Sequence, residues 1–271
     1  PATGPGEKAA VAAFITGTIA EPELKIPVCA DSKVPFDFGE ANWNGWGEGV
    51  ENTRFQATAR AGLTADQVIR LKLKWAFAYP NTFVANGQPT LVGGRVFVGS
   101  ATGTVFSLDA ATGCTYWRYD TGNIARTAIQ IVKPQNETRW IAFFGDSGGT
   151  AHAVDAQTGQ LVWKTKVDDF PLARITGSPV YNNGRVDVPM SSGEETGSGA
   201  ANYECCKFRG SLSALDAKTG RVIWKTFTIP DPPKQYKTTA DGRKMFGPAG
   251  ASLWSAPIID EKRKRIYIGS G

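Results

Sequence analysis

Apolar and polar positions alternate in short runs along most of the chain, and clusters of Gly, Asp, Asn and Ser separate these runs. Such runs predict β-strands joined by tight turns, because successive side chains of a strand point to opposite faces. The expected strands form three groups: 88–92, 95–100 and 104–109; then 127–132, 139–144, 150–155 and 161–165; then 178–181, 185–189, 211–216 and 222–227. A fourth group begins at Trp254 and Ile258, continues over 265–268, and stops at Gly271 in mid-hairpin.

A repeated signature links these groups. The pattern Asp-Ala-x-Thr-Gly-x-x-x-Trp occurs three times, at Asp109–Trp117, Asp155–Trp163 and Asp216–Trp224. In each copy the Asp side chain can accept hydrogen bonds from the amides that follow it, and the Gly can adopt the left-handed conformation of a hairpin turn. The Asp-to-Asp spacings of 46 and 61 residues bracket the length of one four-stranded propeller blade. The third copy therefore contains an insertion, between Met190 and Arg209.

The predicted fold class is all-β, a β-propeller of which about three to four blades are present. A propeller typically closes with about 4 to 8 blades, whereas an unclosed row exposes sheet edges and an apolar face. We interpret the chain as a fragment of a longer protein, cut at both ends. We expect dimerisation to a homo-oligomer, or added terminal strands, to cover the open edges.

The first part of the chain follows other patterns. Residues 1–17 predict a remnant helix, because their apolar side chains share one helical face, and residues 18–39 are Pro-rich and aperiodic, which predicts a linker. The partial propeller is expected over 40–271. Within it, a short helix over 64–70 and a strand over 71–79 precede the first group of strands.

Composition and charge limit the classes of partner. The net charge of +5 is mild, and the short basic run Lys262–Arg265 lies at an expected turn between two strands, so we predict no nucleic-acid contact. No run of eighteen apolar residues occurs, so no membrane span is expected. His152 is the only histidine and lies within a strand, which favours a structural role.

Four stretches resemble a known family: Trp-Asn-Gly-Trp-Gly at 43–47, Asn-Thr-Arg-Phe at 52–55, Met-Ser-Ser-Gly-Glu-Glu at 190–195, and Tyr-Glu-Cys-Cys-Lys-Phe-Arg-Gly at 203–210. Together with the repeat, they are similar to quinoprotein alcohol dehydrogenases, and most of all to those acting on polyvinyl alcohol. The resemblance implies an eight-bladed propeller in the parent protein, with pyrroloquinoline quinone (PQQ) and Ca²⁺ held on the propeller axis. It also implies a periplasmic location.

The resemblance assigns roles to one acidic motif. Ser192-Gly193-Glu194-Glu195 matches the family's Ser-Gly-x-Glu, which implies that Glu195 ligates Ca²⁺, since a carboxylate is a hard oxygen donor for a hard cation. Ser192, Gly193 and Glu194 are then expected beside the cofactor, and Glu194 becomes the ligand if the register shifts by one. From the residues alone, a solvated acidic loop is the competing interpretation.

Three further residues match cofactor-binding positions of the family. Trp254 matches the indole on which the flat quinone stacks, and Arg126 matches an arginine that pairs with quinone carboxylates. Thr176 matches a hydroxyl donor to the cofactor. The competing interpretations are core packing for the tryptophan and ordinary strand-start positions for the other two.

Cys205 and Cys206 are adjacent, which is the rarest feature of the sequence. Neighbouring Cα atoms lie about 3.8 Å apart, below the usual range for disulfide partners, so two free thiols or bonds to Cys29 and Cys114 are alternatives to a vicinal bond. In the family, a vicinal disulfide lies flat over the cofactor. Its position here, after the Ser-Gly-x-Glu motif, differs from the usual one a blade earlier.

The resemblance implies a dehydrogenase that oxidises secondary alcohols, including polymeric ones such as polyvinyl alcohol, by hydride transfer to PQQ. Electrons would pass to cytochrome c, with haem c in the parent protein or in a partner. The family's catalytic base lies beyond this chain, so no catalytic residue is expected within it. The alternative is a non-enzymatic propeller scaffold of the outer-membrane assembly lipoprotein type, which shares the repeat and binds no quinone.

Overall fold

The computed structural model describes residues 13, 26–39, 42–82 and 84–271. Apart from Ala13, the helix expected over 1–17 lies outside the described residues, as does the first part of the expected linker, 18–25. Among the described residues, no helix is long and apolar enough to cross a membrane.

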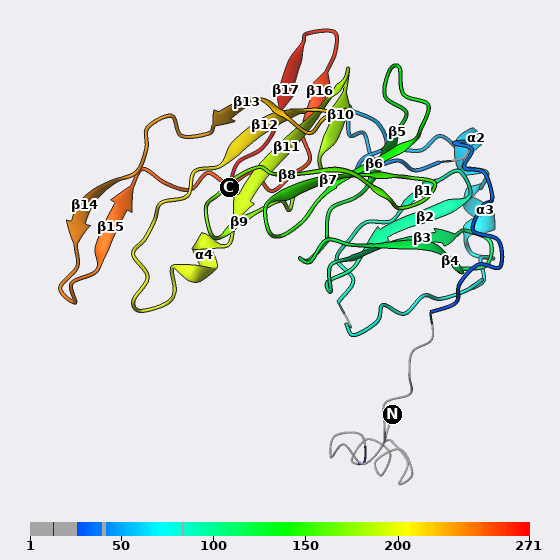
Figure 1. The fold of residues 1–271 in the computed structure, drawn as a ribbon, viewed down its shortest axis with the longest axis horizontal. Coiled ribbons are helices and arrows are strands. Elements are labelled where there is room, and N and C mark those ends of the chain that lie inside the picture. The colour runs from blue at the N-terminus through cyan, green and yellow to red at the C-terminus, as the bar shows by residue number, and fades with distance from the viewer. Residues whose placement is uncertain (1–12, 14–25, 40–41, 83) are drawn as a thin grey trace.

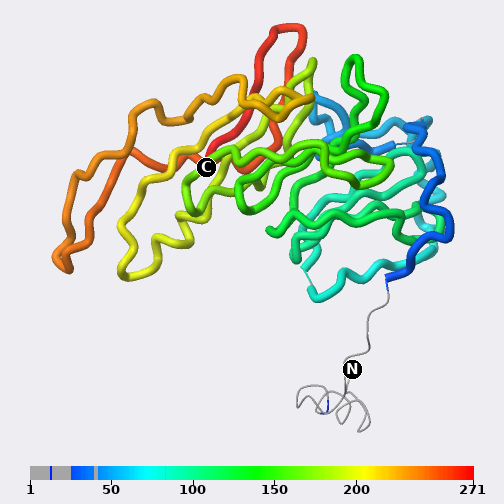
Figure 2. The backbone as a smooth tube through the Cα atoms, in the orientation of Figure 1, coloured from blue at the N-terminus to red at the C-terminus, as the bar shows by residue number. Residues whose placement is uncertain are grey.

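The described chain is nearly all β and forms three successive antiparallel sheets followed by two hairpins (Figures 1 and 2). The first sheet contains β1 (Thr90–Val92), β2 (Arg95–Gly99), β3 (Thr104–Asp109) and β4 (Thr115–Asp120). The second contains β5 (Gln130–Val132), β6 (Ile141–Gly145), β7 (Thr150–Asp155) and β8 (Leu161–Lys166). The third contains β10 (Val180–Asn182), β11 (Arg185–Ser192), β12 (Ser211–Asp216) and β13 (Val222–Phe227), and β9 (Ala173–Arg174) pairs with the end of β11.

The strands of each sheet follow one another in sequence order, so each sheet is a four-stranded meander like a propeller blade. One apolar core lies between the first and second sheets and includes Phe97 and Phe144. Another lies between the second and third sheets and includes Phe143 and Met190. Burial of these side chains between successive sheets supplies the main stabilisation of the row, as predicted for a partial propeller.

The tryptophans of the first two repeats dock on the turn of the repeat that follows. Trp117 Nε1 donates to Ala156 O at 3.0 Å, and its ring covers Gly159, where an added Cβ would lie 2.7 Å from the indole. In the same way, Trp163 Nε1 donates to Ala217 O at 2.9 Å, and its ring covers Gly220. Only a residue without a side chain leaves room for this contact.

The turn itself is held by its aspartate. Asp155 Oδ1 accepts hydrogen bonds from the Gln157 and Thr158 amides and from the Thr158 hydroxyl. The same three bonds recur at Asp109 and at Asp216. The glycine at the end of each turn has a positive φ, as the repeat predicts.

The strand predicted over 71–79 is wrong: this segment is extended but pairs with no strand in the described chain. Trp75 nevertheless donates to Ala110 O at 3.1 Å and covers Gly113, as the fourth-strand tryptophans do in the other repeats. The segment therefore lies where the fourth strand of a preceding sheet would lie, and Leu73 is 86% exposed.

Two short helices precede the segment 71–79: α2 (Thr58–Ala61) and α3 (Ala65–Val68). The second confirms the helix predicted over 64–70 in a shorter form, and Thr64 caps it with Gln67 in a capping box.

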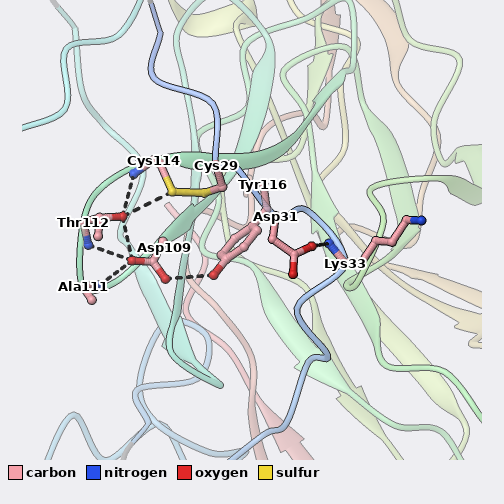
Figure 3. Close-up of a disulfide and its surroundings, with 8 residues drawn as sticks. All are labelled: Cys29, Asp31, Lys33, Asp109, Ala111, Thr112, Cys114 and Tyr116. Atoms are coloured by element: carbon pink, nitrogen blue, oxygen red, sulfur yellow. Dashed lines mark hydrogen bonds between the residues drawn. A yellow bond between two sulfur atoms is a disulfide. The ribbon is translucent and has the colours of Figure 1, made fainter.

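Residues 26–39 run along the first two sheets. A disulfide joins Cys29 to Cys114 (Figure 3). The neighbouring Val28 forms an isolated parallel bridge with Thr115. Further along, the Phe38 ring stacks on Trp140 with centroids 4.7 Å apart. This part of the expected linker is aperiodic, and it is fixed to the sheets by one covalent bond and by aromatic packing.

Two hairpins follow the third sheet. β14 (Lys234–Thr238) pairs with β15 (Lys244–Gly247), and β16 (Ile258–Asp260) pairs with β17 (Arg265–Tyr267). The second hairpin confirms the predicted start of a fourth group, with the basic run at its turn. The first, which projects at the far left of Figure 1, was not predicted.

Candidate functional site

Four residues occupy equivalent places in successive sheets. Each lies four positions before the first strand of a sheet or, in the last case, of the final hairpin: Asn86 before β1, Arg126 before β5, Thr176 before β10 and Trp254 before β16. The backbone supports this equivalence, because the amide just before the last three positions bonds to the end of the second strand of the preceding sheet. These bonds are Ala125 N to Ser100 O (3.1 Å), Ile175 N to Asp146 O (3.0 Å) and Leu253 N to Met190 O (3.0 Å).

The fold thus brings Arg126, Thr176 and Trp254 to one edge of the row of sheets. Arg126 is exposed, and Thr176 Oγ1 lies 2.7 Å from Ser191 Oγ. Trp254 is 39% exposed, so it is not a core residue. Sequence reasoning missed Asn86, although aligning Asn86-Gly-Gln-Pro with Thr176-Gly-Ser-Pro would have found it.

A pocket of about 210 Å³ gathers most of the other predicted residues. Ser192, Glu194, Glu195, Cys206 and Trp254 line it. The remaining lining residues come from the end of the chain: Ala249, Gly250, Ser252 and Gly271. Arg126 and Thr176 are not part of its wall, and Gly193 and Cys205 lie next to lining residues in the chain.

The two glutamates of the acidic motif have different surroundings. Both lie in the short helix α4 (Glu194–Gly197), which directly follows β11. The Glu195 side chain is exposed and makes no hydrogen bond or ion pair with the described residues, so its oxygens can accept a cation. Within the described ranges, no group of three or more His, Cys, Asp or Glu residues converges as a metal site would.

Glu194 is 3% exposed, and both of its oxygens are used. Oε1 accepts from the Tyr203 hydroxyl at 2.9 Å and from the Lys207 amide at 2.7 Å, while Oε2 accepts from the Phe208 amide at 2.8 Å. Burial and, as a smaller cause, the hydrogen bond to this carboxylate raise the pKa of Tyr203 to about 12. This arrangement favours Glu195 over Glu194 as a ligand.

The vicinal disulfide is formed between Cys205 and Cys206, and the remaining pair is Cys29–Cys114. The prediction of a vicinal bond is therefore confirmed over the alternatives. β15 binds the backbone of the pair: the Phe246 amide donates to Cys205 O at 2.6 Å, and the Cys206 amide donates to Phe246 O at 3.2 Å. The hairpin β14–β15 thus holds the disulfide from one side.

His152 is buried within the second sheet, as its predicted structural role requires. Its Nε2 lies 2.9 Å from Asp146 Oδ2, and its Nδ1 lies 3.1 Å from the Tyr119 hydroxyl. The Phe144 ring stacks on the imidazole. These contacts fill the hydrogen-bonding capacity of the ring, and neither His152 nor these partners line the pocket.

Comparison with known proteins places these features in a family. Residues 43–271 match the family described as "PQQ: Glucose/ethanol/alcohol dehydrogenase, beta-propeller domain". A polyvinylalcohol dehydrogenase from Pseudomonas sp is 47% identical over 90% of this chain, and one from Sphingopyxis sp. (strain 113P3) is 43% identical over 91%. The chain spans 38% of the length of each relative.

Solved structures agree at the level of the fold. The quinohemoprotein alcohol dehydrogenase of Comamonas testosteroni superimposes with a TM-score of 0.64 and 21% identity, covering 85% of this chain and 35% of that one. The enzyme ADHIIG of Pseudomonas putida HK5 gives a TM-score of 0.66 and 22% identity, covering 92% of this chain and 37% of that one.

Proposed function

The chain belongs to the family of PQQ-type alcohol dehydrogenase β-propeller domains, and from that premise we propose that its pocket beside Trp254 forms part of a quinone site. The enzyme would oxidise secondary alcohols of the polyvinyl alcohol type, as the names of the 43–47% identical relatives suggest. One observation carries the proposal. Residues separated by more than sixty positions in the sequence, from Ser192 to Trp254, line a single pocket with the vicinal disulfide.

The residues present fit a flat, negatively charged cofactor. Trp254 keeps 39% of its surface exposed at the pocket, where an indole can stack on a planar ring system. Arg126 carries an exposed guanidinium at the equivalent edge position, which suits a carboxylate. Thr176 and Asn86 supply polar side chains at the same level of neighbouring sheets.

Glu195 is our proposed Ca²⁺ ligand. Its exposed carboxylate lines the pocket, and Ca²⁺ prefers oxygen donors of this kind. Glu194 does not compete for the ion, because its oxygens already accept three hydrogen bonds. PQQ, when bound, would supply the hydride acceptor for the oxidation. The residues of this chain would bind and orient it, while Cys206 closes one side of its pocket.

The remaining features of the proposal come from the relatives. A cytochrome c electron acceptor is supported by the name of one relative, a lupanine 17-hydroxylase of Pseudomonas sp whose name includes cytochrome c and which is 27% identical over 84% of this chain. A periplasmic location agrees with the two disulfides, since such bonds persist in oxidising compartments. The scaffold alternative has no comparable support, because the relatives with the highest identity here are named as dehydrogenases.

Quinone binding tests the proposal directly. PQQ is titrated into the chain with and without Ca²⁺, and quenching of tryptophan fluorescence gives the dissociation constant. We expect Glu195→Gln to weaken the Ca²⁺-dependent part by about tenfold or more, because a neutral amide is a poorer calcium ligand. Glu204→Gln is the matched control, since Glu204 pairs with Lys207 and Lys244 and does not line the pocket. Equal binding by the two variants would contradict the metal assignment.

A further inference from the structure

We propose that Glu194 is a positioning residue that holds the Cys205–Cys206 disulfide at the wall of the pocket. Glu194 itself is not expected to touch the metal ion or the substrate. The proposal concerns how this chain places the disulfide, and it rests on the proposed function only for what occupies the pocket.

Glu194 has a rigid base. It directly follows Ser192 and Gly193, and Ser192 ends β11, a central strand of the third sheet. The Gly193 amide donates to Leu172 O at 2.9 Å, and the Glu194 amide donates to Ser192 Oγ at 3.2 Å. The carboxylate therefore projects from a backbone that the sheet fixes.

The donors to the carboxylate lie directly after the disulfide. The consecutive amides of Lys207 and Phe208 reach one oxygen each, at 2.7 Å and 2.8 Å. Hydrogen bonds to an ionised acceptor are shorter and roughly twice as strong as neutral ones. These bonds therefore fix the chain directly after Cys206 to the carboxylate.

A second anchor acts on the other side. Phe246 of β15 exchanges two backbone hydrogen bonds with the cysteine pair, through the amides of Phe246 and Cys206. Strand β15 of the hairpin therefore holds the disulfide on one side, and the carboxylate of Glu194 holds it on the other. Both Glu194 and Cys206 line the pocket, so the length of the glutamate side chain sets how far the disulfide stands from the adjacent Glu195.

A buried carboxylate destabilises the loop that it closes unless hydrogen-bond donors satisfy its oxygens. Burial of an unpaired charge destabilises a protein strongly, whereas here the Tyr203 hydroxyl and two amides satisfy the oxygens. Glutamine offers only one oxygen, and its amide group would face a backbone N–H. Glu194→Gln should therefore loosen the loop without removing any packing volume.

The first measurement is the rate at which a phosphine reductant opens Cys205–Cys206, followed by thiol labelling and mass spectrometry. Cys29–Cys114 is the internal reference, because it lies outside the loop. We expect Glu194→Gln to speed reduction of the vicinal bond by about tenfold and to leave the reference unchanged. Glu204→Gln, in the same loop and exposed to solvent, should behave like the unmodified chain.

The second measurement distinguishes positioning from simple stabilisation. PQQ affinity is measured for the unmodified chain and for Glu194→Gln, each before and after reduction of the vicinal bond. If Glu194 acts through the disulfide, reduction weakens binding in the unmodified chain by several-fold and has much less effect in the variant, since effects on one coupled unit are not additive. Tyr203→Phe removes one bond to the carboxylate and should give an intermediate result.

Each outcome decides one question. The proposal is supported if Glu194→Gln speeds reduction of the vicinal bond alone and if the effects of substitution and reduction on quinone binding are not additive. Acceleration without any change in quinone affinity overturns positioning and leaves a loop anchor, and equal reduction rates in all variants overturn the anchor as well. Failure of the unmodified chain to bind quinone would overturn the proposed function for this chain and the role at the pocket, while the reduction rates still decide whether Glu194 holds the disulfide.

Discussion

The second and third sheets contain corresponding strands and carry the same repeat, but they differ in one connection. Residues 146–149 join β6 to β7, whereas residues 193–210 join β11 to β12. In the short turn, Asp146 is fully buried, and its Oδ1 accepts from the Gly148 and Thr150 amides. In the long connection, Glu194 is also buried, at 3% exposure, and accepts from amides that lie far along the loop.

In both connections a buried carboxylate accepts backbone N–H groups, but the structures that result differ. A buried carboxylate that accepts backbone N–H groups can fold a tight turn, as Asp146 does with His152 beside it. The same device with a longer side chain and a longer loop holds a segment open, and leaves Glu195 and Cys206 beside a pocket. The repeat specifies the sheets, and the interruption of the repeat specifies the site.

The variant with the largest expected effect disrupts the contact between a repeat tryptophan and the turn of the next repeat. Gly159→Ala places a methyl group 2.7 Å from the Trp117 ring and also requires a non-glycine residue at φ +73°. Gly242→Ala is the matched control, because its φ is +87° and an added Cβ meets nothing within 4 Å. We expect a loss of unfolding free energy of about 3 kcal/mol for the first and about 1 kcal/mol for the second. Urea denaturation measures both, and equal losses would show that the docking contact adds nothing.

The next effect separates the two carboxylates. Asp146→Asn removes an acceptor from a turn inside the sheet, so we expect a global loss of about 2 kcal/mol in urea denaturation. Glu194→Gln should shift the global midpoint by less than half as much, because the loop that it holds can open while the third sheet stays folded. If the two variants lose the same stability, the long connection unfolds together with the sheets and the contrast between them is wrong.

Much of the fold could be predicted from the sequence, because the repeat combines turn chemistry with periodic apolar runs. Each Asp-x-x-Thr-Gly turn marks where one strand ends and the next begins, and the structure confirms these boundaries. The segment 71–79 has the same alternation but no hydrogen-bonded neighbour in the described chain, and local pattern cannot reveal a missing partner. The hairpin β14–β15 was missed because all five residues of β14 are exposed, so no apolar face marks it.

The candidate site was predictable only in part. The resemblance assigned cofactor contacts to Arg126, Thr176 and Trp254, and in the structure each precedes the first strand of its sheet or hairpin by the same four positions. Asn86 shares that register without any matched motif. The contrast between Glu194 and Glu195 could not be read from the sequence, because it depends on where Lys207 and Phe208 place their amides in space.

The smallest expected effect is a pH dependence of stability that arises from Tyr203 in the long connection. The pKa of Tyr203 is raised to about 12 by burial and by its bond to Glu194, whereas an unfolded tyrosine has a pKa of about 10. A raised pKa means that the stabilisation by the neutral hydroxyl is complete below pH 10 and is lost as pH rises towards 12, since the unfolded chain releases its proton first.

The urea midpoints of the unmodified chain and of Tyr203→Phe should therefore differ by a constant amount from pH 7 to 9 and converge above pH 10. The tyrosinate absorbance of the folded unmodified chain should show one late ionisation that the variant lacks. A difference that persists unchanged to pH 12 would mean that the hydroxyl does not donate to Glu194, and the anchor of the long connection would then rest on the two backbone amides alone.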